Sequence, residues 1–162
     1  MNPSLALAFV TLLPLVQACG APAGEPPLLT VKELVPRIDQ LNGRTVRVAG
    51  YLAECEGYGC DLYSHEQDLA VWNQVYAKVR ERKRFDWPDL PVLGIGSGDD
   101  FEFDAAAAPF TNSYVVITGR VNNRCRINGK RGCTDRSPDL DPINIVAWRG
   151  PVPAPQSPRR RA

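Results

Sequence analysis

The spacing of apolar residues divides the middle of the chain into strands and helices. Alternation of apolar and polar positions predicts a strand at 45–52. Short apolar runs bounded by turn residues predict four more strands, at 61–64, 91–96, 114–121 and 143–148. Fifteen prolines and thirteen glycines favour short strands and turns over long helices. We therefore expect a mainly β domain with one or two helices, in the α+β class.

Two helices are expected within this pattern. Apolar residues recur at helical spacing over 67–83, and the outer face of that helix is basic, which is typical of a solvated surface. Thr30 and Glu33 form a capping-box pattern, which predicts the start of a short helix that ends at Asn42-Gly43.

The N-terminal stretch has the pattern of an export signal. Leu5 to Val16 is apolar or small and uncharged, which matches the hydrophobic part of a signal peptide. The stretch is shorter than the roughly 20 residues that span a bilayer. The residues before it carry no Lys or Arg, which departs from the usual signal. We expect an exported protein.

Val16-Gln17-Ala18-Cys19 resembles the bacterial lipobox. The resemblance implies that residues 1–18 are a lipoprotein signal peptide and that Cys19 is acylated and becomes the mature N-terminus. A glycine after the cysteine, here Gly20, resembles the pattern of lipoproteins that are sent to the periplasmic side of the outer membrane. The alternative is ordinary cleavage after Ala23, an A-x-A pattern that would discard Cys19. With lipidation at Cys19, residues 19–29 are a Pro/Gly-rich tether. Residues 30–150 are the domain, and residues 151–162 are a disordered Pro/Arg-rich tail.

Four cysteines remain, an even number in an oxidising compartment. Four cysteines can be joined in three ways. We favour the one with two local bridges, Cys55 with Cys60 and Cys125 with Cys133, because each pair encloses a glycine-containing turn. No metal site is expected, since neither spacing is C-x-x-C and no histidine lies near either pair.

Five strands, with glycines inside the first and fourth, suggest an OB-like five-stranded small barrel. The segments LNGRTVRVAGYL and SYVVITGRV resemble the first and fourth strands of small exported bacterial OB-fold-like lipoproteins, over roughly residues 30–149. The predicted helix falls between strands two and three, whereas such folds have it between three and four. A β-sandwich or an open meander is the alternative.

Both cysteine pairs fall on the loops that OB-folds use for binding, between strands one and two and between strands four and five. Basic and aromatic residues on these loops predict a binding surface for an anionic envelope component or an envelope protein. The candidate binding residues are Tyr58, Arg124, Arg126, Lys130 and Arg131, with Arg136 on the same basic rim. The domain is thus expected to be a binding or interaction module of a membrane-anchored lipoprotein.

Enzymatic patterns are weak. His65 is the only histidine, and residues 94–98 match neither a dinucleotide loop nor a P-loop, so no catalytic residue and no cofactor is assigned. The alternative is a small secreted enzyme that acts on an envelope glycan through paired carboxylates. Its candidates are two acidic patches: Asp99, Asp100, Glu102 and Asp104, and Asp135, Asp139 and Asp141. Neither patch follows the EF-hand loop pattern, so no calcium site is assigned to them. Charge is nearly balanced, at 19 basic and 18 acidic residues, and an exported protein meets little nucleic acid, so that partner is disfavoured.

Overall fold

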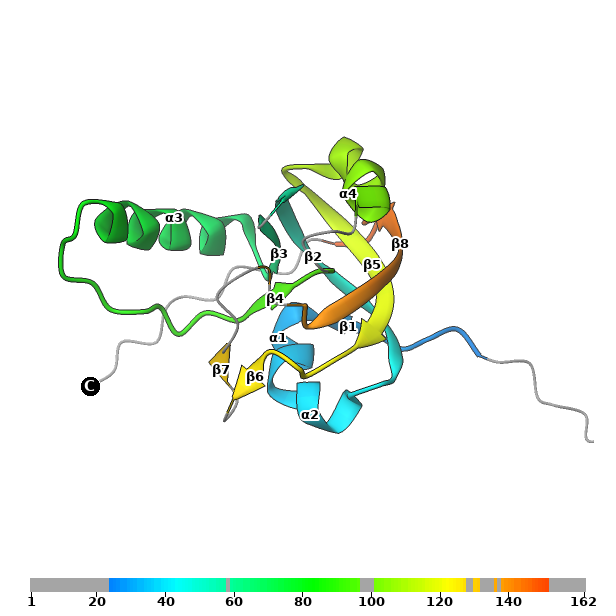
Figure 1. The fold of residues 1–162 in the computed structure, drawn as a ribbon. Helices are drawn as coiled ribbons and strands as arrows, with labels where there is room; N and C mark the ends of the chain where they lie inside the picture. The colour runs from blue at the N-terminus through cyan, green and yellow to red at the C-terminus, as the bar shows by residue number, and fades with distance from the viewer. Residues whose placement is uncertain are drawn as a thin grey trace, which may run out of the picture.

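The fold is a six-stranded sheet with helices packed against it (Figure 1). The computed structural model describes residues 24–57, 59–96, 101–127, 130–131, 136 and 138–151. The strands are β1 (Leu28–Thr30), β2 (Thr45–Glu56), β3 (Gly59–Tyr63), β4 (Val92–Gly94), β5 (Ser113–Val121), β6 (Arg126–Ile127), β7 (Lys130–Arg131) and β8 (Leu140–Ala147). The helices are α1 (Val31–Leu34), η1 (Val35–Arg37), α2 (Ile38–Leu41), α3 (Glu66–Arg80), α4 (Phe101–Ala107) and η2 (Ala108–Phe110).

The sheet is open. Its order is β4-β3-β2-β5-β8, all antiparallel, and β1 lies parallel to β2. The two edge strands meet at one point, a single parallel bridge between Ile95 and Leu140. Because β4 has only three residues, it does not extend this contact into a ladder. The predicted α+β class is confirmed, whereas the closed five-stranded barrel is wrong.

The elements that apolar periodicity predicted are confirmed, with shifted ends. The Thr30 capping box is formed: the Glu33 amide donates to Thr30 Oγ1 at 3.3 Å, and the Thr30 amide donates to Glu33 Oε2 at 2.8 Å. The Thr30 backbone N–H, and after it the Thr30 hydroxyl that donates to Glu33 Oε2 at 2.9 Å, lower the pKa of Glu33. The β6–β7 pair has the register of a two-residue hairpin around the Asn128-Gly129 turn that the sequence suggests. Sequence patterns missed β1 and α4, which are short and depend on tertiary contacts.

Two apolar clusters lie on opposite faces of the sheet, because neighbouring residues of a strand point to opposite sides. The larger is covered by α1–α2 and α4, and its fully buried members include Leu34, Leu52, Leu62, Leu93, Ile95, Ile117 and Leu140. The smaller contains Tyr51, Ala53, Tyr63 and Val92, where Leu69 and Trp72 of α3 pack on the sheet. Only the first part of α3 is therefore fixed to the sheet, and the rest projects from it (Figure 1).

Strand β2 changes neighbours at Gly50. On one edge it pairs with β5 throughout Thr45–Leu52, but on the other it pairs with β1 at 47–49 and with β3 from Tyr51 onward. A Cβ atom at Gly50 would lie 2.7 Å from both Leu62 Cγ and the Tyr63 carbonyl oxygen. It would also lie 2.9 Å from Val31 Cγ2. Only glycine fits where these three elements converge.

A bulge interrupts the edge strand β8. Gly119 of β5 pairs with Pro142 and Thr118 pairs with Asn144, so Ile143 is the extra residue. A Cβ atom at Gly119 would lie 2.6 Å from the Asp141 carbonyl oxygen and 2.7 Å from Leu140 Cγ. The glycine thus lets β8 approach β5 closely beside the bulge.

None of the helices in the described parts of the chain is long and apolar enough to cross a membrane.

We predict that Gly50→Ala destabilises the domain by about 1–3 kcal/mol, because the added methyl must displace β3 or α1. The measurement is urea unfolding in the absence of reductant. Gly59→Ala is the matched control in β3, since its nearest atoms lie at 3.8 Å and 3.9 Å. Equal stability of the two variants would contradict the close convergence at Gly50.

Candidate binding site at the stapled loop

The β2–β3 hairpin is closed by a disulfide between Cys55 and Cys60, which face each other in the ladder. Both cysteines are buried. Cys125 is disulfide-bonded as well, and Cys133, the partner that the sequence predicts, lies outside the described residues. The 55–60 pairing is confirmed, and the 125–133 pairing stays a prediction. We call residues 122–139, between β5 and β8, the stapled loop.

Arg136 fixes the stapled loop to the rest of the molecule. Its side chain is 1 % exposed and donates from Nη2 and Nη1 to the two carboxylate oxygens of Asp104, at 2.7 and 2.9 Å. It also donates to the carbonyl oxygens of Ile95 at 2.7 Å and Gly57 at 3.3 Å. Its Nη2 lies 3.3 Å from Cys55 Sγ. One guanidinium therefore joins the loop to α4, to the end of β4 and to the disulfide-closed hairpin.

Arg126 forms a second buried ion pair. Its Nε and Nη2 donate to the two carboxylate oxygens of Asp139, both at 2.7 Å, and Asp139 is fully buried. Asp139 Oδ2 also accepts from the Gly94 amide at 3.0 Å, while the Asp139 amide donates to the Gly94 carbonyl at 2.9 Å. The loop is thereby fixed to β4 by backbone and side-chain bonds together, a bidentate geometry that orders both partners.

The structure corrects the expected basic rim at two positions. Arg126 and Arg136 are buried because Asp139 and Asp104 neutralise them, so neither presents a free cation to a partner. Arg124 is on the surface: its side chain is 72 % exposed and lies 3.4 Å from Asp141. Lys130 and Arg131 pair through their backbones with Ile127 and Arg126 in the β6–β7 hairpin. Tyr58 lies outside the described residues.

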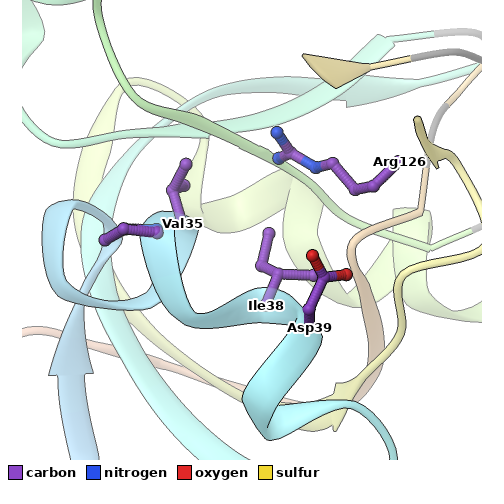
Figure 2. Close-up of a pocket in the computed structure, with 5 residues that line it drawn as sticks. Val35, Ile38, Asp39 and Arg126 are labelled. Atoms are coloured by element: carbon purple, nitrogen blue, oxygen red, sulfur yellow. The ribbon is translucent and has the colours of Figure 1, made fainter. Parts of the chain in front are cut away.

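A pocket of about 180 Å³ opens between η1–α2 and β6 (Figure 2). Its lining is Val35, Pro36, Ile38, Asp39 and Arg126. Figure 2 shows the Arg126 side chain extending from β6 over Ile38, with Asp39 on the helix side. Asp39 accepts a hydrogen bond from Asn123 of the stapled loop at 2.9 Å. This volume is below the roughly 300–1,000 Å³ of small-molecule sites, so the pocket suits a single side chain or a small group.

The acidic patches are engaged in structural contacts where they are described. Asp104 and Asp139 bind the two buried arginines, and Asp141 accepts from Asn122 Nδ2 at 2.7 Å. Glu102 is exposed on α4, while Asp99, Asp100 and Asp135 lie outside the described residues. The paired-carboxylate alternative gains no support from the described members.

One group of possible metal-ligand atoms occurs in the described residues, from Cys55, Cys60 and Asp104, within 4.8 Å of one another. The two sulfur atoms are joined in the disulfide, so neither is a thiolate that could bind a metal ion. This group therefore suggests no metal centre.

His65 has a structural position at the start of α3. It is the N-cap residue, and its backbone N–H donates to Asp68 Oδ2 at 3.2 Å. Burial raises the pKa of Asp68, while nearby His65 and this hydrogen bond oppose the rise.

Burial, with smaller effects of Glu66 and Tyr114, likewise raises the pKa of Tyr51. Three buried polar atoms here have no hydrogen-bond partner among the described residues: Ser64 Oγ, His65 Nδ1 and Trp72 Nε1.

The arrangement at the stapled loop is suited to binding. The contacts of Arg126 and Arg136 hold one loop at several points, and the bonds described there involve no nucleophile beside a base. Sequence reasoning missed the buried role of these arginines; their partners are 13 and 32 residues away along the chain. No family model, curated protein or solved structure matches this chain.

We predict that Arg136→Met lowers the free energy of unfolding by about 3–5 kcal/mol, because Asp104 is left as an unpaired, largely buried carboxylate. Urea unfolding without reductant measures the change. Arg124→Met is the control, with an expected change of at most about 1 kcal/mol because the pair is exposed. Adding Asp104→Leu to Arg136→Met should recover part of the loss, and a double variant as unstable as the sum of the single losses would contradict the pairing.

Proposed function

We propose that this protein is an exported lipoprotein, anchored through Cys19 to the periplasmic side of the outer membrane, whose domain is a binding module. The observation that carries the proposal is the fixation of the stapled loop by two buried arginine–carboxylate pairs. A loop held in this way loses little freedom when a partner binds, which favours association.

We further propose an OB-like organisation for the sheet. The order β4-β3-β2-β5-β8 supports it, because the three-stranded meander is joined to β5 and β8 as in a partly open Greek-key barrel. The Ile95–Leu140 bridge supports it too, since the two edges approach there. In addition, α4 lies between β4 and β5, where the resemblance leads us to expect a helix, and α3 is then an addition between β3 and β4. In this organisation the β2–β3 hairpin and the stapled loop are the two binding loops.

The partner we propose is an anionic envelope component or an envelope protein with an acidic surface. Arg124 is exposed, and Lys130 and Arg131 belong to the same loop by backbone pairing, so three basic residues fall on one fixed segment of the chain. The adjacent pocket offers Val35 and Ile38 as an apolar contact for one side chain or small group of the partner. The ordered contacts of Arg126 and Arg136 serve this surface by positioning it.

Lipidation is tested by mass spectrometry of the mature protein purified from membranes. We expect an N-terminal Cys19 that carries acyl chains, because Ala18-Cys19 follows the apolar stretch. Cys19→Ala should abolish the modification. An unmodified N-terminus at Gly24 would contradict lipidation and favour ordinary secretion.

The binding surface is tested by replacing Arg124, Lys130 and Arg131 with Ala and crosslinking the anchored protein in cells. We expect partner capture to fall several-fold. Loss of the exposed Arg124–Asp141 pair should cost little stability, and circular dichroism checks that the triple variant is folded. The matched control replaces the exposed Arg37, Arg44 and Arg149 with Ala. Arg126 is excluded because its replacement would unpair the buried Asp139. Undiminished capture by the loop variant would refute the assignment.

A further inference from the structure

An arm formed by α3 and the segment that returns to β4 projects from the sheet (Figure 1). The return segment, residues 81–91, packs on α3 through aromatic rings. Trp87 lies 5.9 Å from Trp72 and 4.9 Å from Phe85, and Trp72 lies 5.8 Å from Tyr76, measured between ring centroids. We call these four residues the aromatic cluster.

The aromatic cluster is not fully covered. Trp87 is 62 % exposed and Tyr76 is 39 % exposed. Val79 of the same helix, outside the cluster, is also 39 % exposed. Scattered exposed apolar residues are ordinary, but here large side chains are concentrated on a projecting element. A Trp, a Tyr and a Val together present an apolar surface that a partner can cover.

Residues 78–84 form a basic tip beside this cluster. The tip carries five exposed cations against one carboxylate, Glu81, which pairs with Lys83 at 2.6 Å. The cations are Lys78, Arg80, Arg82, Lys83 and Arg84. The remaining acidic residues of the arm lie at its base or on the return segment, so positive charge is concentrated at the far end. Such a tip is complementary to an anionic surface.

Arg82 occupies a backbone position that favours glycine. Its φ is +53°, at the turn where the Arg82 amide donates to Val79 O and the Lys83 amide donates to Lys78 O. Helices that end in this way usually carry Gly or Asn at that position. A cation is thus present where a glycine would make a more stable turn, in keeping with a use for the charge.

We propose that the arm binds the surface of an anionic phospholipid membrane. The basic tip lies on the charged headgroups, and the aromatic cluster enters the headgroup layer, where Trp and Tyr are favoured. The arm projects from the sheet and its cations are long, exposed side chains, which suits a fluid surface better than a shaped protein groove (Figure 1). The proposal goes beyond the proposed function, because the arm shares no residue with the stapled loop and does not require acylation of Cys19.

The experiment uses the chain without residues 1–18, the expected signal peptide, and with Cys19→Ala, so that neither the apolar stretch nor acylation can cause binding. Trp72→Phe and Trp148→Phe leave Trp87 as the sole tryptophan. Vesicles contain equal parts phosphatidylglycerol and phosphatidylcholine, or phosphatidylcholine alone, each with and without bromine on the acyl chains. We expect a blue shift and bromine quenching of Trp87 fluorescence on the anionic vesicles, with partitioning about tenfold or more above that on neutral vesicles. Raising the salt to about 0.5 M should reverse the effect.

Replacing Arg80, Arg82, Lys83 and Arg84 with Gln should lower partitioning onto the anionic vesicles by about tenfold or more. Replacing the exposed Arg37, Arg44 and Arg149 with Gln is the control and should leave vesicle binding intact. Circular dichroism confirms that each variant is folded. Unchanged Trp87 fluorescence on anionic vesicles, equal quenching on neutral vesicles, or full binding by the Gln variant would overturn the proposal. Crosslinking of the tip to an acidic protein, without a vesicle response, would overturn it in favour of that partner.

Discussion

The absence of a side chain at Gly50 is the constraint on which much of this fold depends. At this one residue β2 exchanges β1 for β3 as its neighbour, while β5 continues along the opposite edge. Leu62, Tyr63 and Val31 all come within 2.9 Å of where a Cβ atom would lie. The first helix can therefore cover the core at the same point where the hairpin begins. The hairpin in turn carries Cys55 and Cys60, and so determines where the stapled loop can attach.

The stapled loop is organised by charge as much as by apolar contact. Burying a guanidinium is costly, and a buried ion pair adds little net stability compared with apolar residues of the same size. Its value here is geometric: each bidentate pair permits one orientation of the two groups, and Arg136 adds bonds to two carbonyl oxygens. A β4 of only three residues is held near β8 by these bonds, in place of the ladder that would close a barrel.

The helices and strands with regular apolar spacing could be predicted from sequence, because burial of one face imposes that spacing. The capping box at Thr30 and the Cys55–Cys60 bridge could be predicted too, since both depend on residues a few positions apart. Helix α4 was missed because Phe101–Ala107 is short and follows acidic residues that suggest a patch. The burial of Arg126 and Arg136 was missed because an arginine in a polar loop has no local signal for a distant carboxylate. The basic residues of the helix predicted at 67–83 were identified as a solvated face. Their position at the end of a projecting arm was missed, because it depends on how little of α3 the sheet covers.

The bulge in β8 determines how this sheet can meet another molecule. An edge strand ordinarily offers a regular row of N–H and C=O groups onto which a foreign strand can be added. Here Pro142 has no N–H to offer, and Ile143 shifts the spacing of the groups that follow it. A second polypeptide therefore finds no continuous template along this margin, and copies of the domain crowded together are protected from joining sheet to sheet. At this edge, contact with another molecule has to rest on side chains, whereas backbone pairing would accept almost any extended chain.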